Sequence, residues 1–167
     1  MDSNTLISFS NLAAVLAKYG EAVCEAYRKE LRDRGKDASG LLSQSVRYMV
    51  NRDGTTYAVD LSLQDYWKYV EYGRRPLSRF PPLDKILEWI KVKPVVPRPM
   101  DNGKLPTEKQ LAFLIGRKIA EDGIKPTPAL DTAVGLTYAQ LIDEIGRAIT
   151  ADLSDAVDGA LNSLVTR

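Results

Sequence analysis

The chain has 167 residues, of which 44% are hydrophobic and 27% are charged, so it is long enough to bury a core. Its net charge of +1 excludes a global basic field that would point to nucleic acid, and the absence of histidine removes the commonest general base and transition-metal ligand. The one cysteine, Cys24, excludes an intrachain disulfide and is interpreted as a small buried residue. The acidic, polar start and the lack of a long apolar run predict neither a signal peptide nor a membrane span.

A long helix is predicted from about Ser3 to Gly35. Its apolar side chains recur at spacings of three and four residues. They are Phe9, Leu12, Ala13, Leu16, Val23, Tyr27 and Leu31. Such a helix is on the order of 45 Å long at 1.5 Å per residue, so we expect it to extend beyond its own core or to support a partner.

A β-hairpin is predicted over residues 45–63, after a turn at residues 37–45. Apolar and polar residues alternate in both halves, which is the pattern of half-buried strands. Asp53-Gly54 between the halves is a strong signal for a tight turn. Because a lone hairpin is marginal in water, we expect it to pack on the long helix or to gain further strands.

The stretch 64–76 is rich in aromatic residues and arginine, with four aromatics within seven residues. One interpretation is a short core helix that Gly73 caps and Pro76 ends. The other is a docking surface, because aromatic residues and arginine carry much of the energy in protein interfaces. The candidate residues at a subunit or partner interface are Trp67, Tyr69, Glu71, Tyr72, Arg74, Arg75 and Phe80.

The second half is predicted to be helical, with two proline-rich, mobile loops. The loops cover residues 74–82 and 91–106, and a short helix beginning near Pro82 separates them. Thr107 and Gln110 form a capping box for a helix over 107–123. A last helix is predicted over 128–155, with Thr127 as its cap, a break near Gly135 and a frayed tail. The second loop and its flanks carry the basic residues Lys91, Lys93, Arg98 and Lys104.

Together these elements predict one α+β domain over residues 1–167, in which the long N-terminal helix and the C-terminal helices pack on a small antiparallel β-sheet built around the hairpin. No phosphate loop, dinucleotide fingerprint or zinc spacing occurs in it. Asp60, Asp65 and Glu71 are the carboxylates from which a Mg²⁺ site would have to be built, but their spacing is not that of a known site. We therefore expect no cofactor and no enzymatic activity.

Four short motifs resemble, in the same order, those of a family of tailed-phage neck proteins: the tail-completion, tail-terminator or head–tail joining proteins. Residues 39–45 are similar to the family's "small-Gly-x-Leu-x-x-Ser" motif before the first strand, and residues 69–73 to its "Tyr-Val-Glu-aromatic-Gly" motif after the hairpin. Trp89-Ile90 with residues 111–119 is similar to the extra helical pair of longer members. Residues 124–130 resemble the "Gly-x-x-x-Pro" turn into the last helix, where this chain has Ala129 in place of the family's frequent Phe.

The resemblance implies a structural virion protein at the head–tail junction, made in the bacterial host cytoplasm. It implies a homo-oligomeric ring, a hexamer where the ring caps a tail tube, that contacts other neck, connector or tail-tube proteins. Genomic DNA would pass through the lumen without sequence specificity, and no membrane would be involved. The aromatic and arginine residues of 67–80 would lie near a subunit boundary, and the four basic residues of 91–104 would face the lumen or a neighbouring ring.

Two other functions fit the residues less well. The basic positions of the loops would also suit a nucleic-acid-binding module, although the nearly neutral net charge argues against it. A metal hydrolase that uses only carboxylates is the third hypothesis, since the lack of histidine lowers the expectation of an enzyme without closing it. The plainer alternative for all these side chains is core packing, capping and a solvated charged face.

Overall fold

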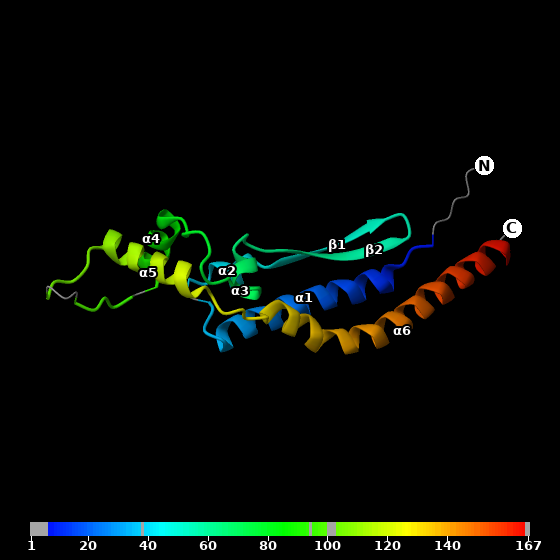
Figure 1. The fold of residues 1–167 in the computed structure, drawn as a ribbon. Coiled ribbons are helices and arrows are strands. Elements are labelled where there is room, and N and C mark those ends of the chain that lie inside the picture. Colours follow the sequence, from blue (N-terminus) through cyan, green and yellow to red (C-terminus); the bar gives the residue numbers. More distant parts are fainter. Residues whose placement is uncertain (1–6, 38, 94, 100–102, 166–167) are drawn as a thin grey trace. The chain divides into compact units, whose positions relative to one another are not determined.

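The structure, a computed structural model, describes residues 7–37, 39–93, 95–99 and 103–165. It confirms a mixed α+β class, in which two long helices pack with a two-stranded antiparallel hairpin (Figure 1). The long helices are α1 (Ser10–Asp33) and α6 (Ala129–Val165), and the hairpin strands are β1 (Arg47–Asp53) and β2 (Thr56–Ser62). The shorter helices are α2 (Leu41–Ser45), α3 (Trp67–Glu71), α4 (Leu83–Val92) and α5 (Glu108–Asp122).

The chain divides into two compact units. The hairpin unit comprises residues 1–28, 46–62 and 131–167, and the loop unit comprises residues 29–45 and 63–130. The expectation of a single domain stays a prediction.

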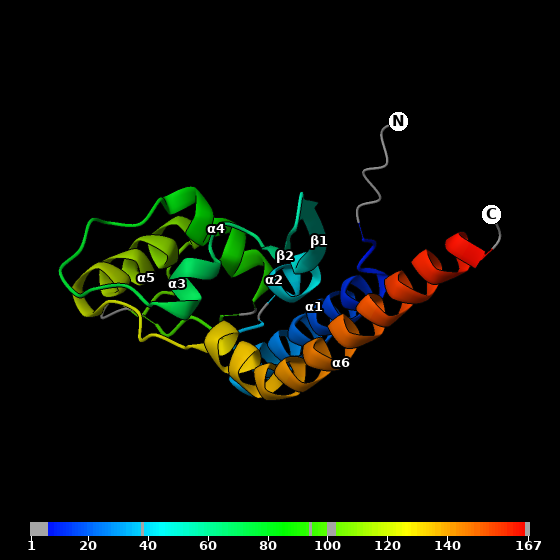
Figure 2. The ribbon, with the colours of Figure 1, turned by 90° about the vertical axis from the view of Figure 1, so that its right-hand side faces the viewer.

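In the hairpin unit, α1 and α6 lie side by side and run antiparallel (Figures 1 and 2). Lys18 of α1 pairs with Glu144 of α6 at 2.7 Å, and further along Leu12 of α1 meets Asp152. The part of α6 after Asp152 therefore continues beyond the first turn of α1. Two alanines of α6, Ala133 and Ala148, are buried, which allows the helices to approach closely.

The hairpin packs on α1 through its inward-facing residues. Its register pairs Val50 with Val59 and closes at Asp53 and Thr56, so the predicted turn is confirmed. Gly20 of α1 makes room for the Tyr48 ring, because a Cβ there would lie 2.4 Å from that ring. The core of the unit is apolar and includes the buried residues Leu16, Val23, Cys24, Tyr27 and Val46. The predicted burial of Cys24 is confirmed, and this burial raises the pKa of its thiol.

In the loop unit, α4 packs on α5 around a glycine. A Cβ at Gly116 would lie 2.5 Å from the Phe80 ring and 3.0 Å from Ile86, so glycine lets both side chains rest on α5. The predicted capping box is confirmed: the Thr107 hydroxyl accepts from the Gln110 amide, and the Gln110 side chain accepts from the Thr107 amide.

Several predicted boundaries were wrong. The first helix begins at Ser10, and residues 7–9 are not helical, while Ser3 lies outside the described residues. The last helix runs unbroken through Gly135 and continues past Asp155 to Val165, because a second long helix supports its first half. Within the predicted turn, residues 41–45 form a short helix instead.

A buried carboxylate of α6 caps the N-terminus of α1. Asp152 is 1% exposed, and its oxygens accept from the Asn11 and Leu12 amides, each at 2.9 Å. Burial alone would raise the pKa of Asp152, but the bonds from Asn11 and Leu12 outweigh it and lower the pKa from the ordinary 3.8. Because these amides have no partner within their own helix, the carboxylate both satisfies them and ties α6 to α1.

Replacing this carboxylate should destabilise the protein in a pH-dependent way. We expect Asp152→Ala to lower the free energy of unfolding by about 1–2 kcal/mol at pH 7, the usual cost of a lost cap. Since folding lowers the pKa, the contribution is complete above the ordinary value of 3.8 and is lost as the pH falls through the lower folded value. Urea unfolding at pH 7 and pH 3 measures this, with Asp158→Ala, an exposed aspartate of the same helix, as control. Equal stability of the two variants at pH 7 would contradict the role of Asp152.

Candidate functional site

The aromatic stretch forms α3 and its exit, where some side chains point outward. Tyr69 is 55% and Tyr72 is 71% exposed, whereas Trp67 is half-buried. The Trp67 and Tyr72 rings lie 5.9 Å apart in a tilted contact. The predicted short helix is confirmed, and Gly73 follows its C-cap with φ +68°.

Immediately after α3 the backbone lies close to the segment that follows α5. The Arg74 amide donates to the Ile124 carbonyl and the Ile124 amide donates to the Arg74 carbonyl, each at 2.8 Å. A Cβ at Gly73 would lie 2.2 Å from the Ile124 oxygen, and one at Gly123 would lie 2.2 Å from the Arg74 oxygen. We call these four residues the two-glycine bridge. Both of its glycines have positive φ, so conformation and space exclude any other residue there.

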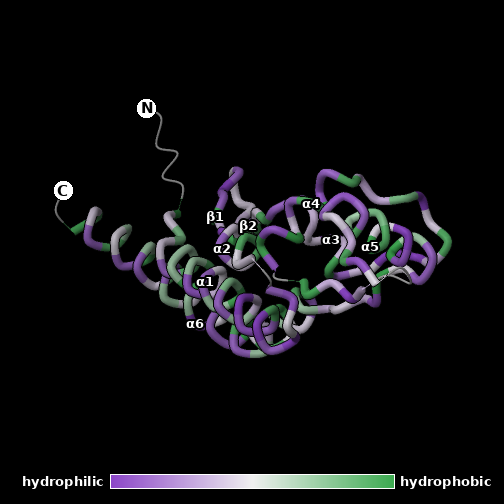
Figure 3. The backbone as a smooth tube through the Cα atoms, turned by 90° about the vertical axis from the view of Figure 1, so that its left-hand side faces the viewer, coloured by the Kyte–Doolittle hydropathy of each residue, from purple (hydrophilic) through white to green (hydrophobic). Residues whose placement is uncertain are grey.

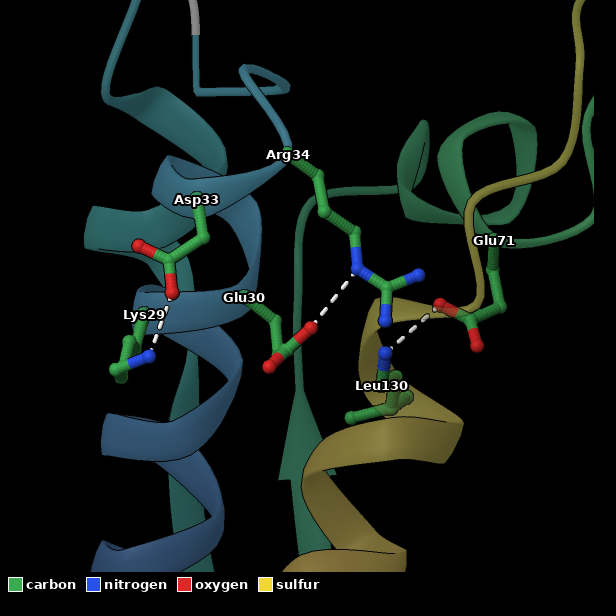
Figure 4. Close-up of polar contacts among 6 residues, drawn as sticks. All are labelled: Lys29, Glu30, Asp33, Arg34, Glu71 and Leu130. Atoms are coloured by element: carbon green, nitrogen blue, oxygen red, sulfur yellow. Dashed lines mark hydrogen bonds and ion pairs between the residues drawn. The ribbon is translucent and has the colours of Figure 1, made fainter.

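Glu71, the acidic residue of α3, fastens the start of α6 (Figure 4). It is 5% exposed, and its carboxylate accepts from the Leu130 amide at 2.9 Å. Beside it, the Thr127 amide donates to the Val70 carbonyl at 2.9 Å. The predicted start at Thr127-Pro128 is thus close to the observed one, but a carboxylate distant in sequence accepts from the first turn. Ala129 is fully buried next to this contact.

The end of α1 in the loop unit carries two ion pairs (Figure 4). Arg34 bonds Glu30 at 2.8 Å, and Lys29 bonds Asp33 at 2.6 Å, both four residues apart. The bond with Asp33 raises the pKa of Lys29, and the same bond lowers the pKa of Asp33. Both are pairs four residues apart along one helix, the Lys29–Asp33 pair exposed and the Arg34–Glu30 pair half-buried, so they indicate no catalytic group.

The loop after the two-glycine bridge is bonded to itself and to α5. The Arg74 guanidinium donates to the Ser78 hydroxyl at 2.9 Å and to the Arg79 carbonyl. The amides of Leu77 and Ser78 donate to carbonyls near the end of α5. Leu77 has φ +55° and is 89% exposed. Arg75, two residues earlier, is also exposed.

A second exposed aromatic group lies on α5. The rings of Phe80 and Phe113 stack with centroids 5.5 Å apart, and they are 38% and 52% exposed. Phe113 also lines a shallow, mainly apolar hollow of about 290 Å³ with Lys109, Gln110 and Leu114. Phe80 therefore rests on Gly116 with one side and leaves an edge accessible to a partner.

The four predicted basic residues are all exposed. Lys91 and Lys93 lie at the end of α4, where the Lys93 ammonium is 5.7 Å from the Trp89 ring. Arg98 and Lys104 flank residues 100–102, which lie outside the described residues. The structure thus places two of them together at a helix end and the other two in the loop before α5.

The described residues contain no group of three or more histidine, cysteine, aspartate or glutamate side chains that could hold a metal ion. Asp60, Asp65 and Glu71 do not form such a group, and Glu71 is occupied by its bond to Leu130. Among the same residues, no helix has the length and apolar composition needed to cross a membrane.

Sequence reasoning missed two parts of this site. It placed Glu71 among candidate interface residues, whereas the side chain is inside the unit and caps α6. It included Gly123 only as the last residue of the helix predicted over 107–123, although that glycine faces Arg74 across the bridge. A signal was present, since Gly73 and Gly123 each follow a predicted helix, but nothing in the sequence shows that two such helix ends meet.

Comparison with known proteins gives no further guide: no family model, no curated protein and no solved structure matches this chain.

The two-glycine bridge should tolerate no side chain. We expect Gly73→Ala to lower the free energy of unfolding by at least about 2 kcal/mol, because left-handed strain adds to a clash with a backbone oxygen. The matched control is Gly35→Ala, which has φ +63° but no atom within 4 Å of the added Cβ, and which should cost about 1 kcal/mol. Urea unfolding of both variants measures the difference. Equal losses would show that the close approach at the bridge is not needed.

Proposed function

We propose that this chain is a structural virion protein of a tailed bacteriophage that forms a ring at the head–tail junction. In this proposal the ring is a homo-oligomer, a hexamer where it caps a tail tube, and it joins the tail to the head connector while DNA passes through its lumen. The protein is not an enzyme and needs no cofactor. Its site is an assembly surface.

One observation supports this proposal above the others: the short motifs that carry the family resemblance bond to their neighbours in one unit. Residues 69–73 and 124–130 are joined by the two-glycine bridge, by the bond of Thr127 to Val70 and by that of Leu130 to Glu71. In the motif at 39–45, Ser45 accepts from the Gln64 amide at 3.1 Å, just before α3. Motifs that stabilise one another in this way are expected of a common framework that presents variable loops.

The geometry also separates residues that build this framework from residues that could meet a neighbour. Glu71 and Arg74 bond within the unit, so their role in assembly is to position the loop. Tyr69, Tyr72 and Arg75 are exposed at its surface, and such residue types dominate interface energies. A closed ring requires heterologous contacts, in which this surface meets a different face of the next copy.

The charge of the chain is compatible with a conduit for DNA. A net charge of +1 supplies no strong field that would hold DNA tightly, while Lys91, Lys93, Arg98 and Lys104 remain exposed to face the lumen or a neighbouring ring. A nucleic-acid-binding module would instead use these residues for affinity. Strong, salt-dependent DNA binding by the monomer would favour that alternative.

Removing the exposed side chains should prevent assembly without unfolding the protein. We expect Tyr69→Ala combined with Arg75→Glu to reduce the number of rings in electron micrographs at least about tenfold, since interface anchors typically contribute more than 1 kcal/mol each. The melting temperature should change by no more than about 2 °C, because exposed positions contribute little to stability.

The control for this experiment is Met49→Ala, which removes a side chain of similar exposure, 60%, from β1. It should leave the rings unchanged. Normal rings from the double variant would exclude the surface of Tyr69, Tyr72 and Arg75 as the subunit boundary, and a large loss of melting temperature would assign Tyr69 and Arg75 to packing.

A further inference from the structure

The hairpin has two edges along which its backbone is open to a further strand. Among the described residues the sheet contains only β1 and β2, so each strand has a neighbouring strand on one side alone (Figures 1 and 2). Both strands are seven residues long, contain no proline and pair without a bulge. The amides and carbonyls along such an edge accept a strand of another chain by main-chain hydrogen bonds.

The tight turn determines which backbone groups of β1 point outward. The loop between the strands has two residues, and Gly54 at its first position has φ +57°, as a type II′ turn requires. In such a hairpin the two residues that flank the loop bond each other, and bonded pairs then alternate with unbonded pairs along the ladder. The amides and carbonyls of Tyr48, Val50 and Arg52 therefore point away from β2.

These outward groups match those of a second β1 that runs antiparallel. With Val50 opposite Val50 of the other copy, Tyr48 lies opposite Arg52, so every outward amide and carbonyl of these three residues finds a partner. Shifting one strand by a single residue would bring these groups opposite residues whose backbone is already bonded to β2. The alternation of the ladder thus favours a register centred on Val50.

The side chains on the outer face of β1 are complementary in this same register. The exposed face carries four residues: Arg47, Met49, Asn51 and Asp53. Arg47 lies three residues before Val50 and Asp53 lies three residues after it, so each arginine is directly opposite the aspartate of the other copy, on the same face of the joined sheet. The Arg47 guanidinium donates to the Val46 carbonyl at 2.9 Å, and its further donors suit a carboxylate. The pair occurs twice, and opposite charges at such positions stabilise paired strands.

The edge of β2 lacks this complementarity. By the same alternation its outward groups belong to Tyr57, Val59 and Leu61, so an antiparallel pair would be centred on Val59. The one charged residue of β2 is Asp60, which would lie diagonally across from Asp60 of the other copy, where like charges repel. Asp60 also bonds Asn51 of its own chain. The edge of β1 is therefore the one that suits a second copy.

The helix beneath the hairpin leaves room for such a pair. A twofold axis perpendicular to the sheet places both copies of α1 on the same face. Contacts to α1 and the residue before it come from both strands: Gly20 lies against the Tyr48 ring of β1, and Phe9 lies 6.3 Å from the Tyr57 ring of β2. Four strands at about 4.8 Å each give a sheet about 19 Å wide, which two helices packed about 10 Å apart can cover.

We propose that the β1 edge docks a second copy of this chain, forming a twofold, four-stranded antiparallel sheet centred on Val50. The contact is isologous, so it closes on itself and does not extend into fibres. Because the hairpin is hydrophilic toward its turn (Figure 3), main-chain bonds and the two ion pairs hold the contact, with little apolar area. The pairing uses no residue of the proposed ring surface and does not depend on that proposal, since a dimer forms whether or not rings do.

Exchanging the charges tests the register. In sedimentation velocity runs over a concentration series, the first associated species of the wild-type chain should be a dimer. We expect Arg47→Asp alone, or Asp53→Arg alone, to weaken dimerisation about tenfold, because each replaces two ion pairs by two like-charged pairs. The double exchange should restore the dissociation constant to within about threefold. A wild-type chain that never forms a dimer, or a double variant that dimerises no better than the single ones, would overturn the proposal.

Proline tests the main-chain bonds. Since the Arg52 amide points outward, Arg52→Pro keeps the ladder of the hairpin but removes the bond to Tyr48 of the other copy, and it should weaken dimerisation at least about tenfold. The matched control is Arg52→Ala, which loses the same side chain, placed over the Tyr57 ring, but keeps the amide. It should stay within about threefold of the wild type. Equal constants for the two variants, or loss of the fold in Arg52→Pro by circular dichroism, would contradict the outward direction of this amide.

Cysteine cross-linking distinguishes antiparallel from parallel pairing, in a Cys24→Ser background. Met49 of one copy lies opposite Asn51 of the other in an unbonded pair, where the Cα atoms are closest. A mixture of Met49→Cys and Asn51→Cys chains should therefore form disulfide dimers in mild oxidant at least about fivefold faster than either variant alone. Fastest cross-linking of Met49→Cys with itself would indicate a parallel pair, and equal rates would indicate chance collisions. Either result would contradict the proposal.

Discussion

The loop unit depends on the close approach of two backbone segments at the two-glycine bridge. Gly73 and Gly123 end α3 and α5, and each lies against a carbonyl oxygen of the other segment at a distance that no side chain permits. The reciprocal bonds between Arg74 and Ile124 then fix where the loop after α3 begins and where the turn into α6 lies. With Glu71 bonded to the first turn of α6, this region positions α3 and its exposed residues Tyr69 and Tyr72.

In the hairpin unit a single buried carboxylate has a comparable role. Asp152 accepts hydrogen bonds from two amides at the N-terminus of α1. These bonds fix the position of α6 along the axis of α1. As a result, the residues of α6 after Asp152 continue beyond the first turn of α1. Leu164 lies in this continuing part of α6 and is 70% exposed.

Local patterns in the sequence predicted the elements better than their ends or their contacts. The hairpin, α3, the capping box at Thr107 and the burial of Cys24 follow from periodicity, turn chemistry and residue type, and the structure confirms them. The length of α6 did not follow, because small and polar residues after Asp155 weaken the periodic signal. The roles of Glu71 and Asp152 could not be predicted, since each acts on a helix far away in sequence.

This division explains why the sequence identified the candidate site only in part. Aromatic and arginine enrichment drew attention to residues 67–80, but it cannot separate a side chain that caps a helix from one that faces a partner. The structure makes that separation: Glu71 and Arg74 are bonded inside the unit, while Tyr69, Tyr72 and Arg75 are exposed. The proposal of a neck protein rests on these exposed residues and on the family resemblance of the framework that holds them.

The most direct test of the proposed function is the mass of the purified wild-type chain by light scattering over a concentration series, with electron micrographs of the largest species. The account predicts a species of six or twelve copies that appears as a ring with a central hole. Masses that never exceed a dimer, together with salt-dependent DNA binding by the free chain, would contradict the ring and favour a nucleic-acid-binding module.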